Sequence, residues 1–147
     1  MKPKLLIRIA AVLMFLHMVG HSFGVFSRRV PNATIGRILQ DMNDNFFPFM
    51  GRSASLGIFF QGYGVVLILD LLFTSVLLWW LASQTGTEQG KKLLLGSFLY
   101  LAALACLEVI YKFPFFLTIP AAGCLLVALL KPSPRRIFAG AVTAQSK

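Results

Sequence analysis

The two histidines of the chain, His17 and His21, have the spacing that most readily supports chemistry. Residues four apart project from the same face of a helix, and Met14 and Met18 lie beside the pair on that face. Imidazole binds zinc, iron and copper, and methionine sulfur adds a preference for copper, so His17 and His21 could ligate haem or a transition metal. The glutamate of HExxH zinc sites is missing here. Histidines that hydrogen-bond between packed helices are the ordinary alternative.

Other polar side chains fall inside apolar stretches, where they are costly and usually face the interior of a helix bundle. Counting along each stretch places His17 and Asp70 near mid-depth. His21 and Glu108 lie toward the outer side, and Tyr63 shares a helix face with Asp70. We therefore expect His17 to lie near Asp70. We expect His21 to lie near Glu108 and Tyr63, which completes a candidate polar site inside the membrane.

Two of these residues have further interpretations. Glu108 and Lys112 have the i,i+4 order that favours an ion pair at the membrane interface. Asp70 at mid-depth could be protonated, paired with a histidine, or part of a proton path. The sequence alone leaves these roles open.

No spacing in the sequence matches a catalytic motif. A Ser-His-Asp arrangement, a Walker phosphate loop and a dinucleotide fingerprint are all missing, so we predict no catalytic residue. The glycines of "GYG", Gly62 and Gly64, together with Gly123 beside two alanines, instead predict close packing between helices. Cys106 and Cys124 lie in apolar runs and are interpreted as small packing residues.

The composition is typical of an integral membrane protein. Hydrophobic residues make up 57% of the chain and charged residues 13%, whereas a soluble domain carries roughly 25% charged residues. The net charge of +9 comes from basic residues that flank the apolar runs. That placement indicates a lipid bilayer as the partner rather than nucleic acid.

Four apolar segments approach the roughly 20 residues that a spanning helix needs. They predict a single domain over residues 1–131, an up-down bundle of four transmembrane helices with a short amphipathic helix in the first outer loop. The first segment is interpreted as a retained helix, not a signal peptide. Pro120 predicts a kink in the last helix, and residues 132–147 a short basic cytoplasmic tail. The expected helices cover residues 5–26, 55–81, 93–111 and 115–130.

The basic residues also predict the orientation. Of the 14 Lys and Arg residues, nine fall on the side that holds both termini and five on the other. Because Lys and Arg are enriched in cytoplasmic segments, both termini are predicted to be cytoplasmic. The nine are Lys2, Lys4, Arg8, Lys91, Lys92, Lys131, Arg135, Arg136 and Lys147, and the five are Arg28, Arg29, Arg37, Arg52 and Lys112.

Three stretches resemble a family of small uncharacterised bacterial membrane proteins. They are "LLIRIAAVLMFLHMVGHSFG" (Leu5 to Gly24), "FPFMG" (Phe47 to Gly51) and "GYG" (Gly62 to Gly64). The resemblance covers roughly the first half of the chain and implies a four-helix integral membrane protein, in the bacterial inner membrane, with no established activity. In that family an acidic residue often precedes the helix-two glycines, where this chain has "GIFFQ". The shared pattern residues are Gly20, His21, Gly51, Gly62 and Gly64.

Three functions remain open from the sequence. The first is a non-enzymatic accessory, assembly or interaction subunit, which has a membrane-protein partner or forms a homo-oligomer. The second is a haem- or metal-binding redox protein that uses His17 and His21. The third is an oligomeric proton-coupled transporter or channel centred on Asp70.

Overall fold

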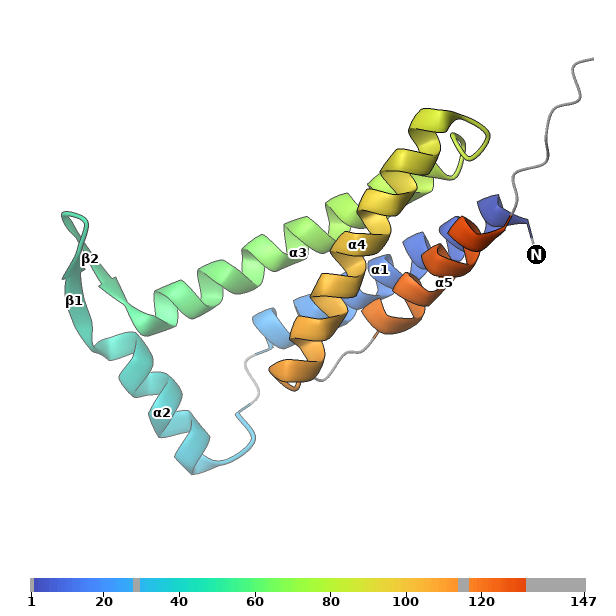
Figure 1. Cartoon of the computed structure of the whole chain (residues 1–147). Helices are drawn as coiled ribbons and strands as arrows, with labels where there is room; N and C mark the ends of the chain where they lie inside the picture. The colour runs from blue at the N-terminus through green and yellow to red at the C-terminus, as the bar shows by residue number, and fades with distance from the viewer. Residues whose placement is uncertain (1, 28–29, 114–116, 132–147) are drawn as a thin grey trace, which may run out of the picture.

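The computed structural model describes residues 2–27, 30–113 and 117–131, and these residues are mostly helical (Figure 1). They form five helices and one β-hairpin. The expected tail, residues 132–147, and the first two residues of the fourth expected helix, 115–116, lie outside the described part of the chain. In chain order, the elements are α1 (Pro3–Phe26), α2 (Ala33–Asp44), β1 (Phe46–Phe49), β2 (Arg52–Ser55), α3 (Leu56–Leu81), α4 (Glu88–Ile110) and α5 (Thr118–Leu130).

Three of the described helices, α1, α3 and α4, are long and apolar enough to cross a membrane. The fourth expected span is represented by α5, which has 13 residues. A helix of that length rises about 20 Å, less than the roughly 30 Å of a bilayer's hydrocarbon core. Length and composition therefore give three membrane-spanning candidates, with α5 as a shorter apolar helix packed among them.

Side-chain caps set where the helices begin. Ser55 accepts a hydrogen bond from the backbone N–H of Ile58 at the start of α3. Thr87 accepts one from Gly90, so α4 begins at Glu88 and not at the expected residue 93. The extra turn is polar and extends α4 beyond its apolar stretch, which is why hydropathy alone misplaced its start.

The core is built around α1, which packs against α3 on one side and α5 on the other, while α5 also packs against α4. Both α1 and α5 bury alanines, and such small side chains let helix backbones approach closely. The buried alanines are Ala10, Ala11, Ala121, Ala122 and Ala128. By contrast, α3 and α4 contact each other little; they are close at their connecting loop and diverge toward the opposite end (Figure 1). The largest fully buried apolar side chains are Ile7, Met14, Leu71, Leu78, Leu101 and Leu125.

The position of Pro120 in α5 gives no reason for the predicted kink. Pro120 is the third residue of α5. A backbone N–H in the first turn has no partner within its own helix, so a proline there removes no helical hydrogen bond. Pro120 therefore lies at the start of α5 rather than in its interior.

The contacts between α1 and α3 run in antiparallel order along both helices. Near the N-terminus, the Arg8 guanidinium lies 5.0 Å from the centre of the Trp79 ring. One turn further, the Ser75 hydroxyl donates a hydrogen bond of 2.9 Å to the carbonyl of Ala11. These contacts fix the register in which α1 presents its histidines to the rest of the bundle.

A β-hairpin that the sequence did not predict precedes α3. Its two strands pair from Phe46↔Ser55 to Phe49↔Arg52. Met50 and Gly51 between them both have positive φ, as a two-residue type I′ turn requires. A methionine at the first turn position and a proline within β1 are poor hairpin signals, so only Gly51 could have pointed to it.

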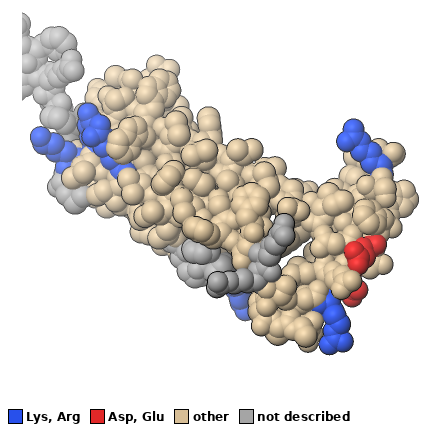
Figure 2. Space-filling view, turned by 180° about the vertical axis from the view of Figure 1, so that it is seen from behind, with Lys and Arg blue, Asp and Glu red and all other residues tan. Residues whose placement is uncertain are grey.

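The predicted amphipathic helix in the first loop is present as α2. It contains no buried residue, and apolar side chains including Ile35 and Ile38 are exposed. It lies with the hairpin at the end of the molecule opposite the N-terminus (Figure 1). On the face drawn in Figure 2, most Lys, Arg, Asp and Glu side chains lie toward the two ends, with a broad uncharged region between them.

Candidate functional site

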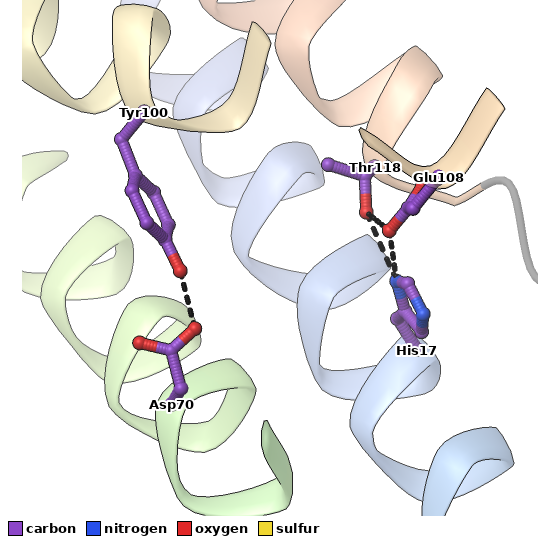
Figure 3. Close-up of polar contacts among 5 residues, drawn as sticks. All are labelled: His17, Asp70, Tyr100, Glu108 and Thr118. Carbon is purple, nitrogen blue, oxygen red and sulfur yellow. Dashed lines mark hydrogen bonds and ion pairs between the residues drawn. The ribbon is translucent and has the colours of Figure 1, made fainter. Parts of the chain in front are cut away.

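Three polar side chains from three helices meet inside the bundle: His17 of α1, Glu108 of α4 and Thr118 of α5 (Figure 3). The Nδ1 atom of His17 lies 3.0 Å from the Oγ1 atom of Thr118. The Thr118 hydroxyl donates a hydrogen bond of 2.6 Å to Oε1 of Glu108. His17 Nδ1 is also 3.6 Å from Oε1 of Glu108, within ion-pair distance. We call these three residues the polar trio.

The polar trio is buried. His17 is 5% exposed, Glu108 is 4% exposed and Thr118 is fully buried. The second carboxyl oxygen of Glu108, Oε2, is buried and has no hydrogen-bond partner among the described residues. An unpaired buried carboxylate oxygen is costly, and among the described residues this oxygen is the buried side-chain polar atom that lacks a partner.

The turn that follows α4 helps to position Glu108. Phe113 donates its backbone N–H to the Glu108 carbonyl at 2.9 Å, and Lys112, with φ 54°, donates to Val109. This pattern is a Schellman motif, which ends the helix at Ile110. The predicted Glu108–Lys112 ion pair is therefore wrong: Lys112 lies beyond the helix, and the side chain within ion-pair distance of Glu108 is that of His17.

The second histidine faces a different helix. Nε2 of His21 donates a hydrogen bond of 3.3 Å to the carbonyl of Gly64 on α3. A Cβ atom at Gly64 would come within 2.8 Å of the Val25 side chain, so this glycine allows a close contact between α1 and α3. The predicted grouping of His21 with Glu108 and Tyr63 differs from the structure, because His21 turns toward the α3 backbone.

Asp70 forms a separate polar pair. The Tyr100 hydroxyl of α4 donates a hydrogen bond to Asp70 Oδ2 of α3 (Figure 3). Asp70 is half-buried, and Tyr100 is 42% exposed. The predicted His17–Asp70 neighbourhood is not formed, because α5 lies against α1 and supplies Thr118 to His17 instead. Tyr63 is 74% exposed and belongs to neither cluster.

The three glycines predicted at helix contacts differ in how close their neighbours lie. Of the three predicted at helix contacts, Gly64 has a close neighbour, whereas a Cβ atom at Gly62 or Gly123 would meet nothing within 4 Å. Within the described chain, Gly62 and Gly123 therefore do not mark helix contacts. Both could admit a neighbour from another molecule.

Two members of these clusters, Thr118 and Tyr100, were missed by the sequence reasoning. A hydroxyl group in an apolar helix is common, and neither residue stands out by type. The available signals were positional: Thr118 follows the turn after Glu108, and Tyr100 lies near the middle of α4, at the depth assigned to Asp70.

No protein-family model, curated protein or solved structure matches this chain. Across the described ranges, no group of three or more His, Cys, Asp and Glu side chains could hold a metal ion. What the chain can do therefore has to be inferred from the polar trio, the Asp70–Tyr100 pair and the arrangement of the helices.

Proposed function

We propose that the chain is a non-enzymatic membrane subunit, which assembles with another membrane protein or with copies of itself. The observation that supports this function is the Asp70–Tyr100 pair, which lies between α3 and α4 where the two helices diverge. Both residues are near the middle of long apolar helices, and both are partly exposed.

Lipid cannot satisfy this pair. A carboxylate accepts several hydrogen bonds, and hydrocarbon tails donate none. The apolar side chains on the outside of α3 need no protein cover, because lipid tails suit them equally well. A polar pair half-exposed at that depth is best covered by a polar group from another protein chain.

The same proposal includes the membrane topology. A fourth crossing is made at α5, and the chain is an integral protein of a bacterial inner membrane. Both termini are cytoplasmic, because the basic residues at the ends of α1, α4 and α5 fall on one side. In the described part these are Lys2, Lys4, Arg8, Lys91, Lys92 and Lys131.

The mass of the complex in mild detergent tests the assembly. We expect the wild type to run as an oligomer or with a co-purifying membrane protein, and Asp70→Leu to shift it toward the monomer. Asp44→Leu on α2 is the control, because it removes the same charge from a residue outside the apolar helices. A wild-type chain that runs alone as a monomer contradicts the proposal.

The two alternatives from the sequence receive less support from the geometry. His17 and His21 bond to different helices rather than facing one space, and Asp70 is engaged by Tyr100. A haem or metal protein would show a Soret band or bound metal that His17→Ala and His21→Ala remove. A transporter centred on Asp70 would show a pH-dependent flux in liposomes that Asp70→Asn abolishes.

A further inference from the structure

The polar trio is a continuous hydrogen-bonded chain across three helices. It runs from His17 Nδ1 through Thr118 Oγ1 to Glu108 Oε1, with separations of 3.0 Å and 2.6 Å. Thr118 is the central member, and its hydroxyl is in hydrogen-bonding range of the other two (Figure 3). The assembly function proposed above uses none of these residues.

The protons of the polar trio can be arranged in two ways without moving any of its heavy atoms. A hydroxyl carries one proton and can also accept one. If Glu108 is ionised, Thr118 donates to it, and His17 Nδ1 must carry a proton that it donates to Thr118. If Glu108 is protonated at Oε1, it donates to Thr118, which donates to an unprotonated Nδ1. Both arrangements satisfy the two hydrogen bonds of the polar trio.

We propose that the polar trio is a buried proton-binding relay, in which one proton is held at either His17 or Glu108 and passes between them through Thr118. In the transfer, the Nδ1–H bond of His17 breaks and a new O–H bond forms at Thr118. The original O–H bond of Thr118 breaks, and its proton forms the O–H bond of Glu108. The step starts from a His17 imidazolium, which carries protons on both ring nitrogens and keeps the one on Nε2. Imidazolium and carboxylate thereby become neutral imidazole and carboxylic acid, with no other reactant.

The unpaired Oε2 of Glu108 is the second observation behind the relay. A buried ionised carboxyl with one unsatisfied oxygen is costly, and a bound cation lowers that cost. Among the described residues no set of side chains is suited to a metal ion. A proton needs no further ligands, so it is the cation that this site accommodates.

The helices around the trio carry other groups that can titrate, so the relay must be observed residue by residue. His21 lies one turn from His17, and the pair of Asp70 and Tyr100 is separate from the trio in Figure 3. The other titratable groups on the packed helices are Lys4, Arg8 and His21 on α1, Tyr63 and Asp70 on α3, Glu88, Lys91, Lys92, Tyr100 and Cys106 on α4, and Cys124 on α5.

The composition of the chain makes such an observation feasible. It contains two histidines, His17 and His21, and two glutamates, Glu88 and Glu108. The full-length protein, labelled with ¹³C-glutamate and ¹⁵N-histidine and held in lipid nanodiscs, gives the signals of two glutamate carboxyl groups and two imidazole rings in a pH titration by NMR. His21→Gln and Glu88→Gln assign them without touching the trio.

We expect the Glu108 carboxyl signal to move between its ionised and protonated positions over the pH range in which the protein stays folded. The His17 ring signals should change with the same midpoint. Thr118→Val, which removes the hydroxyl and keeps the shape, should separate the two midpoints, whereas Thr118→Ser should keep them together. A Glu108 signal that does not move in the wild type overturns the relay, as does a Thr118→Val protein whose two midpoints still coincide. The wild-type titration decides the matter if Thr118→Val does not fold.

Discussion

Lys112 shows how one residue can be held in an unfavourable conformation by the turn around it. Its φ of 54° places it in the left-handed region, which costs a residue with a Cβ atom about 1–2 kcal/mol and costs glycine little. We therefore expect Lys112→Gly to raise the free energy of unfolding by about 1 kcal/mol, seen as a higher thermal midpoint in detergent. Lys112→Ala is the control, since it removes the charge and keeps the strain. Equal midpoints for the two variants would exclude strain as the cause.

The residues of the candidate site could be selected from the sequence, but their pairing could not. His17, Asp70 and Glu108 stand out because ionisable groups are rare in apolar segments. Which of them meet depends on the order of the helices in space, and α5, placed between α1 and α4, brings Glu108 and not Asp70 to His17. No periodicity in a single segment carries that information.

At the scale of elements, the contact between α1 and α3 depends on Gly64. A side chain there would meet Val25, whereas the same side chain at Gly62 would enter open space. We expect Gly64→Leu to destabilise the protein by about 1–3 kcal/mol through overpacking and to weaken the His21 hydrogen bond to the Gly64 carbonyl. Thermal unfolding in detergent measures the loss.

Gly62→Leu is the matched control for Gly64. It adds the same side chain to the same helix two residues earlier, with the same gain in helix propensity. A midpoint for Gly62→Leu as low as that for Gly64→Leu would contradict a specific contact at Gly64. It would indicate instead that both faces of α3 pack against something, for example a second copy of the chain.

The long helices could be predicted because hydropathy reports them directly, and α1 and α3 begin and end within two residues of the expected positions. The elements that depend on a few polar residues were harder to predict from the sequence. The start of α4 is set by the Thr87 cap inside a polar stretch. The β-hairpin is stabilised by Phe47 and Phe49, whose ring centres lie 6.0 Å and 5.1 Å from that of Phe59. Such aromatic contacts are visible only after the hairpin has folded onto α3.

At the scale of the whole molecule, the packing is uneven from one end to the other. The buried residues of α1 lie between Leu6 and His17, and apart from Gly57 those of α3 lie between Leu71 and Leu81. Toward the end of the molecule that holds α2 and the hairpin, the apolar side chains of α1 and α3 are mostly exposed. A cleft of about 620 Å³ lies there beside α1, lined by residues that include Met18, Phe23 and Phe26. That half of the bundle is the part that lipid or a partner must cover, whereas the polar trio marks the limit of the chain's own core.

Cysteine labelling can test the proposed topology, above all whether α5 crosses the membrane. In a chain with Cys106 and Cys124 replaced by alanine, single cysteines at Ser53, Gln89 and Lys131 report three positions along the path. We expect an impermeant maleimide to label Ser53→Cys in intact bacterial cells, because the proposed topology places the hairpin outside. Gln89→Cys and Lys131→Cys should react only after the membrane is opened. Labelling of Lys131→Cys in intact cells would mean that the 13 residues of α5 enter the membrane and return to the same side, whereas exchanged labelling of Ser53→Cys and Gln89→Cys would invert the orientation.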